Sequence, residues 1–131
     1  MAWNTPNMKT TTLTLTGAAI KAAIPNLTLD NTADIILETE FFDAGDIVVG
    51  CIGRVTSTFG IGGVLNFHTS VGAPFPIGSI DMINGTPQNP AAFLKITDNI
   101  NLEVNAQVFG GVFSDILDSG SIDLTFLSFT P

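Results

Sequence analysis

The sequence predicts an all-β fold: a two-sheet antiparallel β-sandwich of jelly-roll or related Greek-key type. Stretches rich in Val, Ile, Thr and Phe recur roughly every ten residues, and clusters of Gly, Pro, Asn and Asp separate them. No stretch carries an amphipathic helical pattern long enough to form an independent helix. With 131 residues, the chain has the length of one domain. About seven to nine short strands around one core fit these observations.

The first residues are expected to form an arm (1–8), and the domain is expected to span residues 9–131. Pro6 disfavours both a helix and a central strand, and Trp3 is the one tryptophan of the chain. The indole either folds back on its own domain or inserts into a neighbouring subunit. The sequence leaves both alternatives open.

The first third of the domain predicts two strands joined through a short helical segment. Alternating Thr and Leu indicate a strand over 9–16, and the alanines of 17–24 favour one or two helical turns, which Pro25 ends. A short strand is expected at 27–29. In the strand expected over 34–42, alternate residues point to opposite faces. One face then carries Ile35, Leu37, Thr39 and Phe41, and the other carries Ile36, Glu38, Glu40 and Phe42.

The stretch from Ala44 to Thr69 is the longest apolar and clearly bounded segment of the chain. It predicts a strand over 47–56, a tight reversal over 57–63 and a second strand over 64–69. Both faces of the first of these strands are apolar. The alternation places Ile47, Val49, Cys51 and Val55 on one face, with Val48 and Ile52 on the other. Two apolar faces need cover on both sides, from another sheet or from another subunit.

The second half of the chain begins with an irregular segment (70–90) that Gly and Pro interrupt repeatedly. A short strand over 77–83 is expected to end at Asn84-Gly85, a strong hairpin signal. Residues 109–120 are expected to form a loop. Three further strands are expected over 92–97, 100–108 and 121–129, and the middle one alternates cleanly between apolar and polar residues.

The charge of the chain excludes some classes of partner. Twelve acidic residues against four basic ones give a formal net charge of -8. Phosphate backbones would be repelled, so a nucleic-acid partner is not expected. No apolar run is long enough to span a membrane, and the start, MAWNTPNMKTTT, lacks the apolar core of a secretory signal, so synthesis in a cytoplasm is expected. Only 12% of residues are charged, which suggests that other subunits cover part of the surface.

The residue types used in catalysis and metal binding are sparse and scattered. His68 is the one histidine, and a lone imidazole does not make a cupin-type metal site. Cys51 is expected to be a small buried hydrophobe. Glu38 and Glu40 lie two residues apart on one strand face, which is typical of carboxylates that face water. We therefore expect no catalytic residue, no metal and no cofactor.

Three pairs of aspartates lie in expected loops: Asp30 with Asp34, Asp43 with Asp46, and Asp115 with Asp118. Aspartates at such positions commonly bond to the backbone of turns. Calcium binding by loop carboxylates remains the alternative, although no pair has the spacing of a calcium loop.

Several segments resemble, in order and spacing, the small virion proteins of tailed bacteriophages of the capsid cement or decoration type. The resemblance covers about residues 34–130 and rests on AGDIVVG (44–50), VTSTFG (55–60), GVLNF (63–67), the alternating strand 101–108 and GSIDLTF (120–126). It implies a jelly-roll-like β-sandwich, often trimeric, that lies on or between capsid subunits without catalysis. The arm and residues 70–90 have no counterpart.

The resemblance and the composition together predict a non-catalytic structural protein of the virion, located on the capsid surface. The expected partners are the major capsid protein or other virion proteins, and a homo-oligomer, with a trimer favoured. Aromatic side chains dominate many interfaces. The expected contact anchors are Trp3, Phe59, Phe75, Phe109 and Phe113.

Two other classes of function stay open. The first alternative is a tail or fibre module that binds a glycan or a protein of the host surface. The second is a small β-fold hydrolase or isomerase, which requires a deep pocket lined by Glu38, Glu40 and His68.

Overall fold

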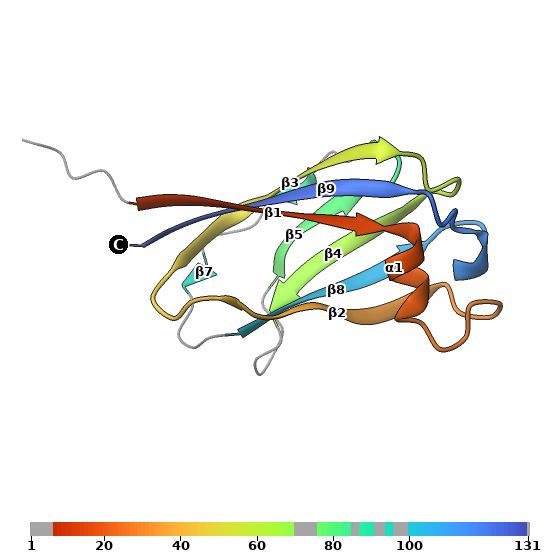
Figure 1. Ribbon diagram of the computed structural model, residues 1–131, viewed down its shortest axis with the longest axis horizontal. Helices are drawn as coiled ribbons and strands as arrows, with labels where there is room; N and C mark the ends of the chain where they lie inside the picture. Colours follow the sequence, from red (N-terminus) through yellow and green to blue (C-terminus); the bar gives the residue numbers. More distant parts are fainter. Residues whose placement is uncertain (1–6, 70–75, 85–86, 91–93, 96–99, 131) are drawn as a thin grey trace, which may run out of the picture.

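The computed structural model describes residues 7–69, 76–84, 87–90, 94–95 and 100–130. Over these residues, two antiparallel β-sheets pack face to face (Figure 1). The elements are, in chain order, β1 (Asn7–Thr16), α1 (Gly17–Ala22), β2 (Thr32–Phe42), β3 (Ile47–Ser57), β4 (Gly63–Thr69), β5 (Pro76–Asp81), β6 (Pro87–Pro90), β7 (Leu94–Lys95), β8 (Ile100–Val108), the 3-10 turn η1 (Phe113–Asp115) and β9 (Ser121–Thr130).

The order of the strands identifies the sandwich as a jelly roll. Sheet A has the order β1-β9-β3-β7, and sheet B has the order β2-β8-β4-β5-β6. The pairs are nested: β1 pairs with β9, β2 with β8, β3 with β7, and β4 with β5. Such nesting is what a long hairpin gives when it rolls up into two sheets. The predicted all-β, two-sheet antiparallel sandwich is confirmed.

Strands with clean alternation form where the sequence places them. β8 covers the predicted residues 100–108, and its apolar face is buried at Leu102, Val104, Ala106 and Val108. In β2, Ile35 is buried whereas Ile36 is exposed, as the alternation predicts. β1 begins at Asn7, so its pairing with β9 starts inside the segment that the sequence assigns to the arm.

Phe126 of β9 joins the two sheets at the centre of the core. Its ring makes edge-on contacts with Phe41 of β2, at a centroid distance of 5.3 Å, and with Phe67 of β4, at 5.5 Å. Both partners belong to sheet B, whereas β9 belongs to sheet A. Edge-to-face pairs at this distance add to the free energy that burial supplies.

The predicted faces of β3 are wrong beyond Val48, because the strand contains a bulge. Val48 pairs with Ser128, but the next residue of β9, Leu127, pairs with Gly50, so one extra residue stands in β3. The bulge reverses the alternation. Val48 and Cys51 therefore both face the core, and Ile52 lies outside with 52% of its surface exposed.

The segment 57–63 does not reverse the chain within one sheet. It carries the chain from β3 in sheet A to β4 in sheet B, at the end of the sandwich where α1 lies (Figure 1). The strand expected at 27–29 is also wrong, since these residues form a turn. The carbonyl of Leu27 accepts a hydrogen bond of 2.8 Å from the Ser114 N–H, so this backbone bonds to a loop instead of a strand.

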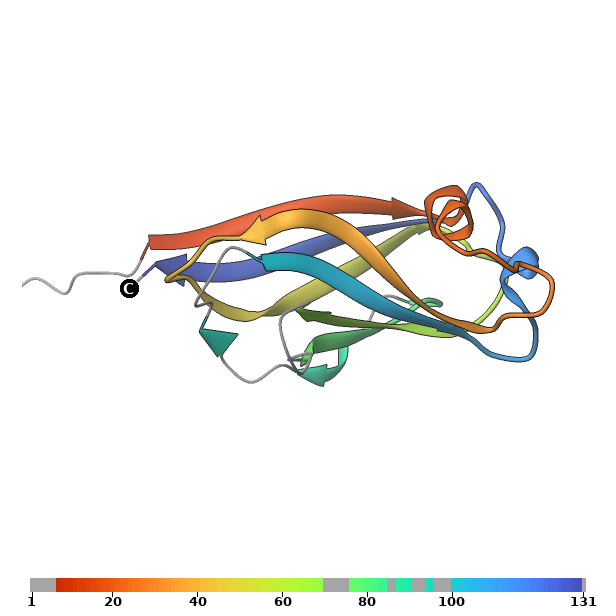
Figure 2. The same cartoon turned by 90° about the horizontal axis from the view of Figure 1, so that it is seen from below.

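The short helix α1 closes one end of the sandwich. The Thr16 hydroxyl accepts a hydrogen bond of 3.1 Å from the Ala19 N–H and caps the helix, and Ile20 is fully buried. Gly17 has no room for a Cβ because the carbonyl of Leu117 occupies that space. Figure 2 shows α1 and η1 at this end, with the C-terminus at the opposite end. None of the helices in the described ranges has the length and apolar character to cross a bilayer.

Candidate interaction surfaces

Three of the five aromatic residues expected as contact anchors lie in the described part of the chain. Phe59 and Phe113 are buried in the core, with 1% and 0% of their surface exposed, so neither is on the outer surface of the chain. Phe109 is 54% exposed. Trp3 and Phe75 lie outside the described residues.

The two buried phenylalanines belong to loops that fold over the end of the sandwich. The carbonyl of Phe59 accepts a hydrogen bond of 2.8 Å from the Leu117 N–H, and the Phe113 N–H donates a bond of 3.0 Å to the carbonyl of Asp30. The ring of Phe59 packs against Gly120 so closely that a Cβ there would overlap it. Both residues therefore extend the core beyond the ends of the strands.

The outer face of sheet A carries an apolar patch that no described segment of the chain covers. Register places five residues there on neighbouring strands: Met8 pairs with Phe129, Phe129 with Ile47, and Leu127 and Ile52 follow on the same face. Met8 is 60% exposed, and Phe129, Ile47 and Leu127 are half-buried. We call these five residues the sheet A patch.

Polar side chains occupy the same face on the side towards α1. Thr14 donates a hydrogen bond of 2.8 Å to Asp123, and the hydroxyls of Thr12 and Thr125 lie 3.3 Å apart. Arg54 pairs with Asp123 in the register of β3 and β9, so these two neighbouring charges on the face are of opposite sign. The face is nearly neutral on a chain whose formal net charge is -8.

The outer face of sheet B is mostly polar, with Ile36 as an exposed apolar exception. The Asn105 side chain donates a bond of 2.9 Å to Asp34, and the Ser79 hydroxyl donates one of 2.5 Å to Asn66. His68 lies between two carboxylates, with Nε2 3.8 Å from Asp34 and Nδ1 3.5 Å from Glu103. Amides, hydroxyls and carboxylates of this kind suit hydrogen bonding to a polar ligand.

The loop aspartates bond to different partners, except that Asp43 and Asp46 both lie within ion-pair distance of Lys9. Asp46 accepts a hydrogen bond of 2.8 Å from Lys9 and one of 2.9 Å from Thr130, whereas Asp115 accepts the Val112 N–H at 3.0 Å. Asp118 pairs with Lys21 at 2.6 Å. Within the described ranges, no group of three or more His, Cys, Asp or Glu side chains is arranged to hold a metal ion.

Lys9 and Asp46 perturb each other's protonation. The hydrogen bond from Lys9 holds the pKa of the Asp46 carboxyl below its ordinary value, against the opposing effect of burial. The same bond raises the pKa of Lys9, although desolvation partly opposes it. Asp46 is 5% exposed, so the pair fixes the turn between β2 and β3 to the start of β1.

Cys51 has the environment that the sequence predicts. It is buried in the core, and burial raises the pKa of its thiol to about 12. A thiol with this pKa is a poor nucleophile at neutral pH. The residue therefore contributes to packing.

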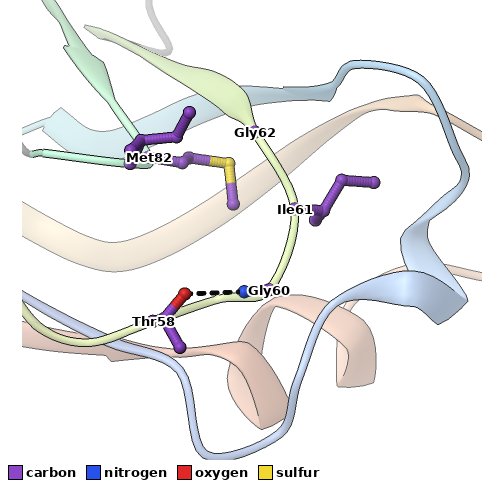
Figure 3. Close-up of a pocket in the computed structure, with 6 residues that line it drawn as sticks. Thr58, Gly60, Ile61, Gly62 and Met82 are labelled. Atoms are coloured by element: carbon purple, nitrogen blue, oxygen red, sulfur yellow. Dashed lines mark hydrogen bonds between the residues drawn. The ribbon is translucent and has the colours of Figure 1, made fainter.

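A shallow, open hollow of about 250 Å³ lies where β3 connects to β4. Figure 3 shows Thr58 and Gly60 along one edge and Met82 at the opposite edge. The Thr58 hydroxyl accepts a hydrogen bond of 3.0 Å from the Gly60 N–H. The lining includes neither His68 nor the two glutamates of β2, Glu38 and Glu40, whose side chains lie outside the described part of the chain.

No protein-family model matches the sequence, and a comparison with curated proteins found no relative.

Proposed function

We propose that this protein is a non-catalytic structural subunit of a virus particle, a capsid cement or decoration protein that stabilises the assembled shell. The sheet A patch is the observation that carries the proposal. Within the part of the chain that the structure describes, nothing covers these five apolar side chains on three neighbouring strands, and contact with another molecule would remove them from water. Contiguous exposed apolar surface commonly marks a protein–protein contact.

Size and charge both suit contact between copies of this chain. A face of three strands, with about ten residues per strand, has an area of about 500 Å² at ~3.3 Å per residue and ~4.8 Å per strand. A specific interface buries at least about 500 Å² on each partner and typically about 800 Å², so this face reaches the lower limit. Because this face is nearly neutral, two acidic copies that meet through it repel each other less than they would through their other surfaces. A homo-oligomer is the expected form, with a trimer favoured by the resemblance to decoration proteins.

The jelly roll supports this proposal only in combination with the patch. Viral capsid proteins, lectins and cupins all use this architecture, and a fold does not determine a function. A subunit that binds the shell and not its free components stabilises the shell by mass action. The proposed partners are the major capsid protein or other virion proteins, at the capsid surface.

Co-sedimentation tests the proposal. The purified protein is expected to sediment with assembled empty shells and to remain in the supernatant with unassembled shell subunits. Replacing Ile52 and Leu127 with threonine keeps both strands β-prone and removes apolar area from the contact between copies, so the oligomer and its multivalent binding to shells should weaken. Equal binding of the variant and the original chain would remove the sheet A patch from the account.

The polar outer face of sheet B favours the second candidate, a tail or fibre module that attaches to a host glycan or protein. Asn66, Asn105 and Asp34 present side-chain acceptors and donors on adjacent strands. A glycan array with consistent hits, abolished by Asn66→Ala and Asn105→Ala, would establish this candidate over the first.

A further inference from the structure

A second apolar surface lies at the end of the sandwich that α1 closes. Seven large hydrophobic side chains are exposed in the described ranges, and four of them belong to the chain connections at this end. They are Leu29 (75% exposed), Ile83 (69%), Phe109 (54%) and Leu117 (46%). With the half-buried Ile61, we call them the apolar tip.

The connection between β3 and β4 brings Ile61, Ile83, Phe109 and Leu117 together. The Phe109 N–H donates a hydrogen bond of 2.9 Å to the carbonyl of Gly62, and a Cβ at Gly62 would lie 3.3 Å from Cδ1 of Ile83. Leu117 packs on Gly60, and Ile61 packs on Gly111. Ile61 and Ile83 line the hollow of Figure 3 beside Gly60 and Gly62, whose lack of side chains leaves it open.

Aspartates border the apolar tip. Asp81 accepts the Ile83 N–H at 2.6 Å, and Asp115 approaches Gly111 beside Ile61. Asp30 follows Leu29, and Asp118 follows Leu117. Lys21 pairs with Asp118, so the four aspartates and one lysine give this end a formal charge of -3.

The other basic residues of the chain lie elsewhere. Arg54 is on the outer face of sheet A, and Lys9 bonds to Asp46 at the opposite end of the sandwich. Lys95 belongs to β7, which pairs with Ile47. A second copy of this chain therefore offers little positive charge to the tip, and anionic lipid or nucleic-acid surfaces would be repelled.

We propose that the apolar tip docks on a different protein, which presents an aliphatic or aromatic side chain flanked by lysine or arginine. The apolar side chain enters the hollow between Gly60 and Met82, and the flanking cations meet Asp30, Asp81 and Asp115. Complementary charge around an apolar centre gives such a contact its specificity and its rate of association. The tip is separate from the sheet A patch, so this proposal stands even if self-association fails.

Amide NMR of the full chain, titrated with two matched peptides, tests the proposal. The first peptide has a Leu-Phe-Leu core with two lysines on each side, and the second has glutamates in place of the lysines. The lysine peptide is expected to give saturable shifts at Gly60, Gly62, Ile83, Phe109 and Leu117. The glutamate peptide is expected to bind at least about tenfold more weakly.

Variants separate the apolar part of the contact from the charged part. Ile83→Ser with Leu117→Ser is expected to raise the Kd of the lysine peptide about tenfold. Asp30→Asn with Asp115→Asn is expected to raise the Kd of the lysine peptide several-fold and to bring it closer to the Kd of the glutamate peptide. The amide oxygen that Asp115→Asn introduces can still accept the hydrogen bond from the Val112 N–H. Ile36→Ser is the control. Ile36 is 58% exposed but lies on the outer face of sheet B, so this substitution should leave peptide binding unchanged.

Three results would overturn the proposal: no saturable shifts with either peptide, equal affinity for both, or shifts confined to the sheet A patch. Equal loss of binding in the Ile36→Ser control would also do so. Retained dispersion of the amide spectrum shows that each variant is folded.

Discussion

The Nζ atom of Lys9 lies 2.8 Å from Oδ2 of Asp46, and this ion pair joins the start of β1 to the turn between β2 and β3. The same carboxylate accepts a hydrogen bond from Thr130 near the end of β9. Three segments that are distant in sequence therefore meet at one buried carboxylate. This arrangement fixes the end of the sandwich that lies opposite the apolar tip.

Asp46 is expected to make folding stability depend on pH in the acid range. Its pKa is lower in the folded state than the ordinary value of 3.8. The stabilisation that the ionised carboxylate supplies is therefore fully present above pH 3.8 and is lost as the pH falls through the folded-state pKa. Lys9 has a raised pKa, so its contribution is present below 10.5 and is lost at higher pH. Between these limits the contribution of the pair should be constant.

Urea denaturation at a series of pH values measures this dependence. Asp46→Asn should lower the free energy of unfolding at pH 7. In this variant the free energy of unfolding should also fall less steeply as the pH drops below 3.8. Asp43→Asn is the control, because this carboxylate lies 3.8 Å from Lys9 and is 70% exposed. If both variants behave alike, the buried ion pair does not carry the effect.

Phe126→Ala should be among the most destabilising single changes in the chain. It removes the ring that contacts both Phe41 and Phe67 and leaves a cavity between the sheets. The expected loss is about 3–5 kcal/mol in the free energy of unfolding. Phe126→Leu keeps most of the volume and should cost roughly 1–2 kcal/mol. Comparable losses for the two variants, measured by urea denaturation, would show that the ring contacts are not what joins the sheets.

Cys51 should resist alkylation in the folded protein. Its pKa of about 12, against an ordinary 9.0, lowers the thiolate fraction at pH 8 by about a thousandfold, and burial blocks the reagent. Iodoacetamide labelling followed by mass spectrometry should therefore proceed only as fast as the protein opens. Full labelling in urea is the positive control. Rapid labelling without denaturant would place the thiol at the surface.

Regular alternation is what made part of this fold predictable from sequence. Residues 100–108 alternate without interruption, so both the strand and its buried face follow from a period of two. The extra residue in β3 has no such signature. Gly50 is one glycine among several, and only the pairing with Leu127 reveals that it reverses the faces of the strand.

The exposed patches are harder to predict from the sequence than the strands are. Phe59 and Phe113 lie in segments without periodicity, so no pattern indicates that these loops fold over the core. The sheet A patch combines residues that are more than a hundred positions apart, such as Met8 and Phe129. Such a patch becomes visible only once strand order and register are known.

Sedimentation velocity of the full chain is the most direct test of the central claim, that the sheet A patch is covered by other copies. At micromolar concentration the protein should sediment as an oligomer, and Ile52→Thr with Leu127→Thr should shift it towards a monomer without loss of folded structure. Ile36→Thr, on the outer face of sheet B, should leave the oligomer unchanged. A monomer at every concentration, or an oligomer that the paired substitution does not affect, would contradict the account.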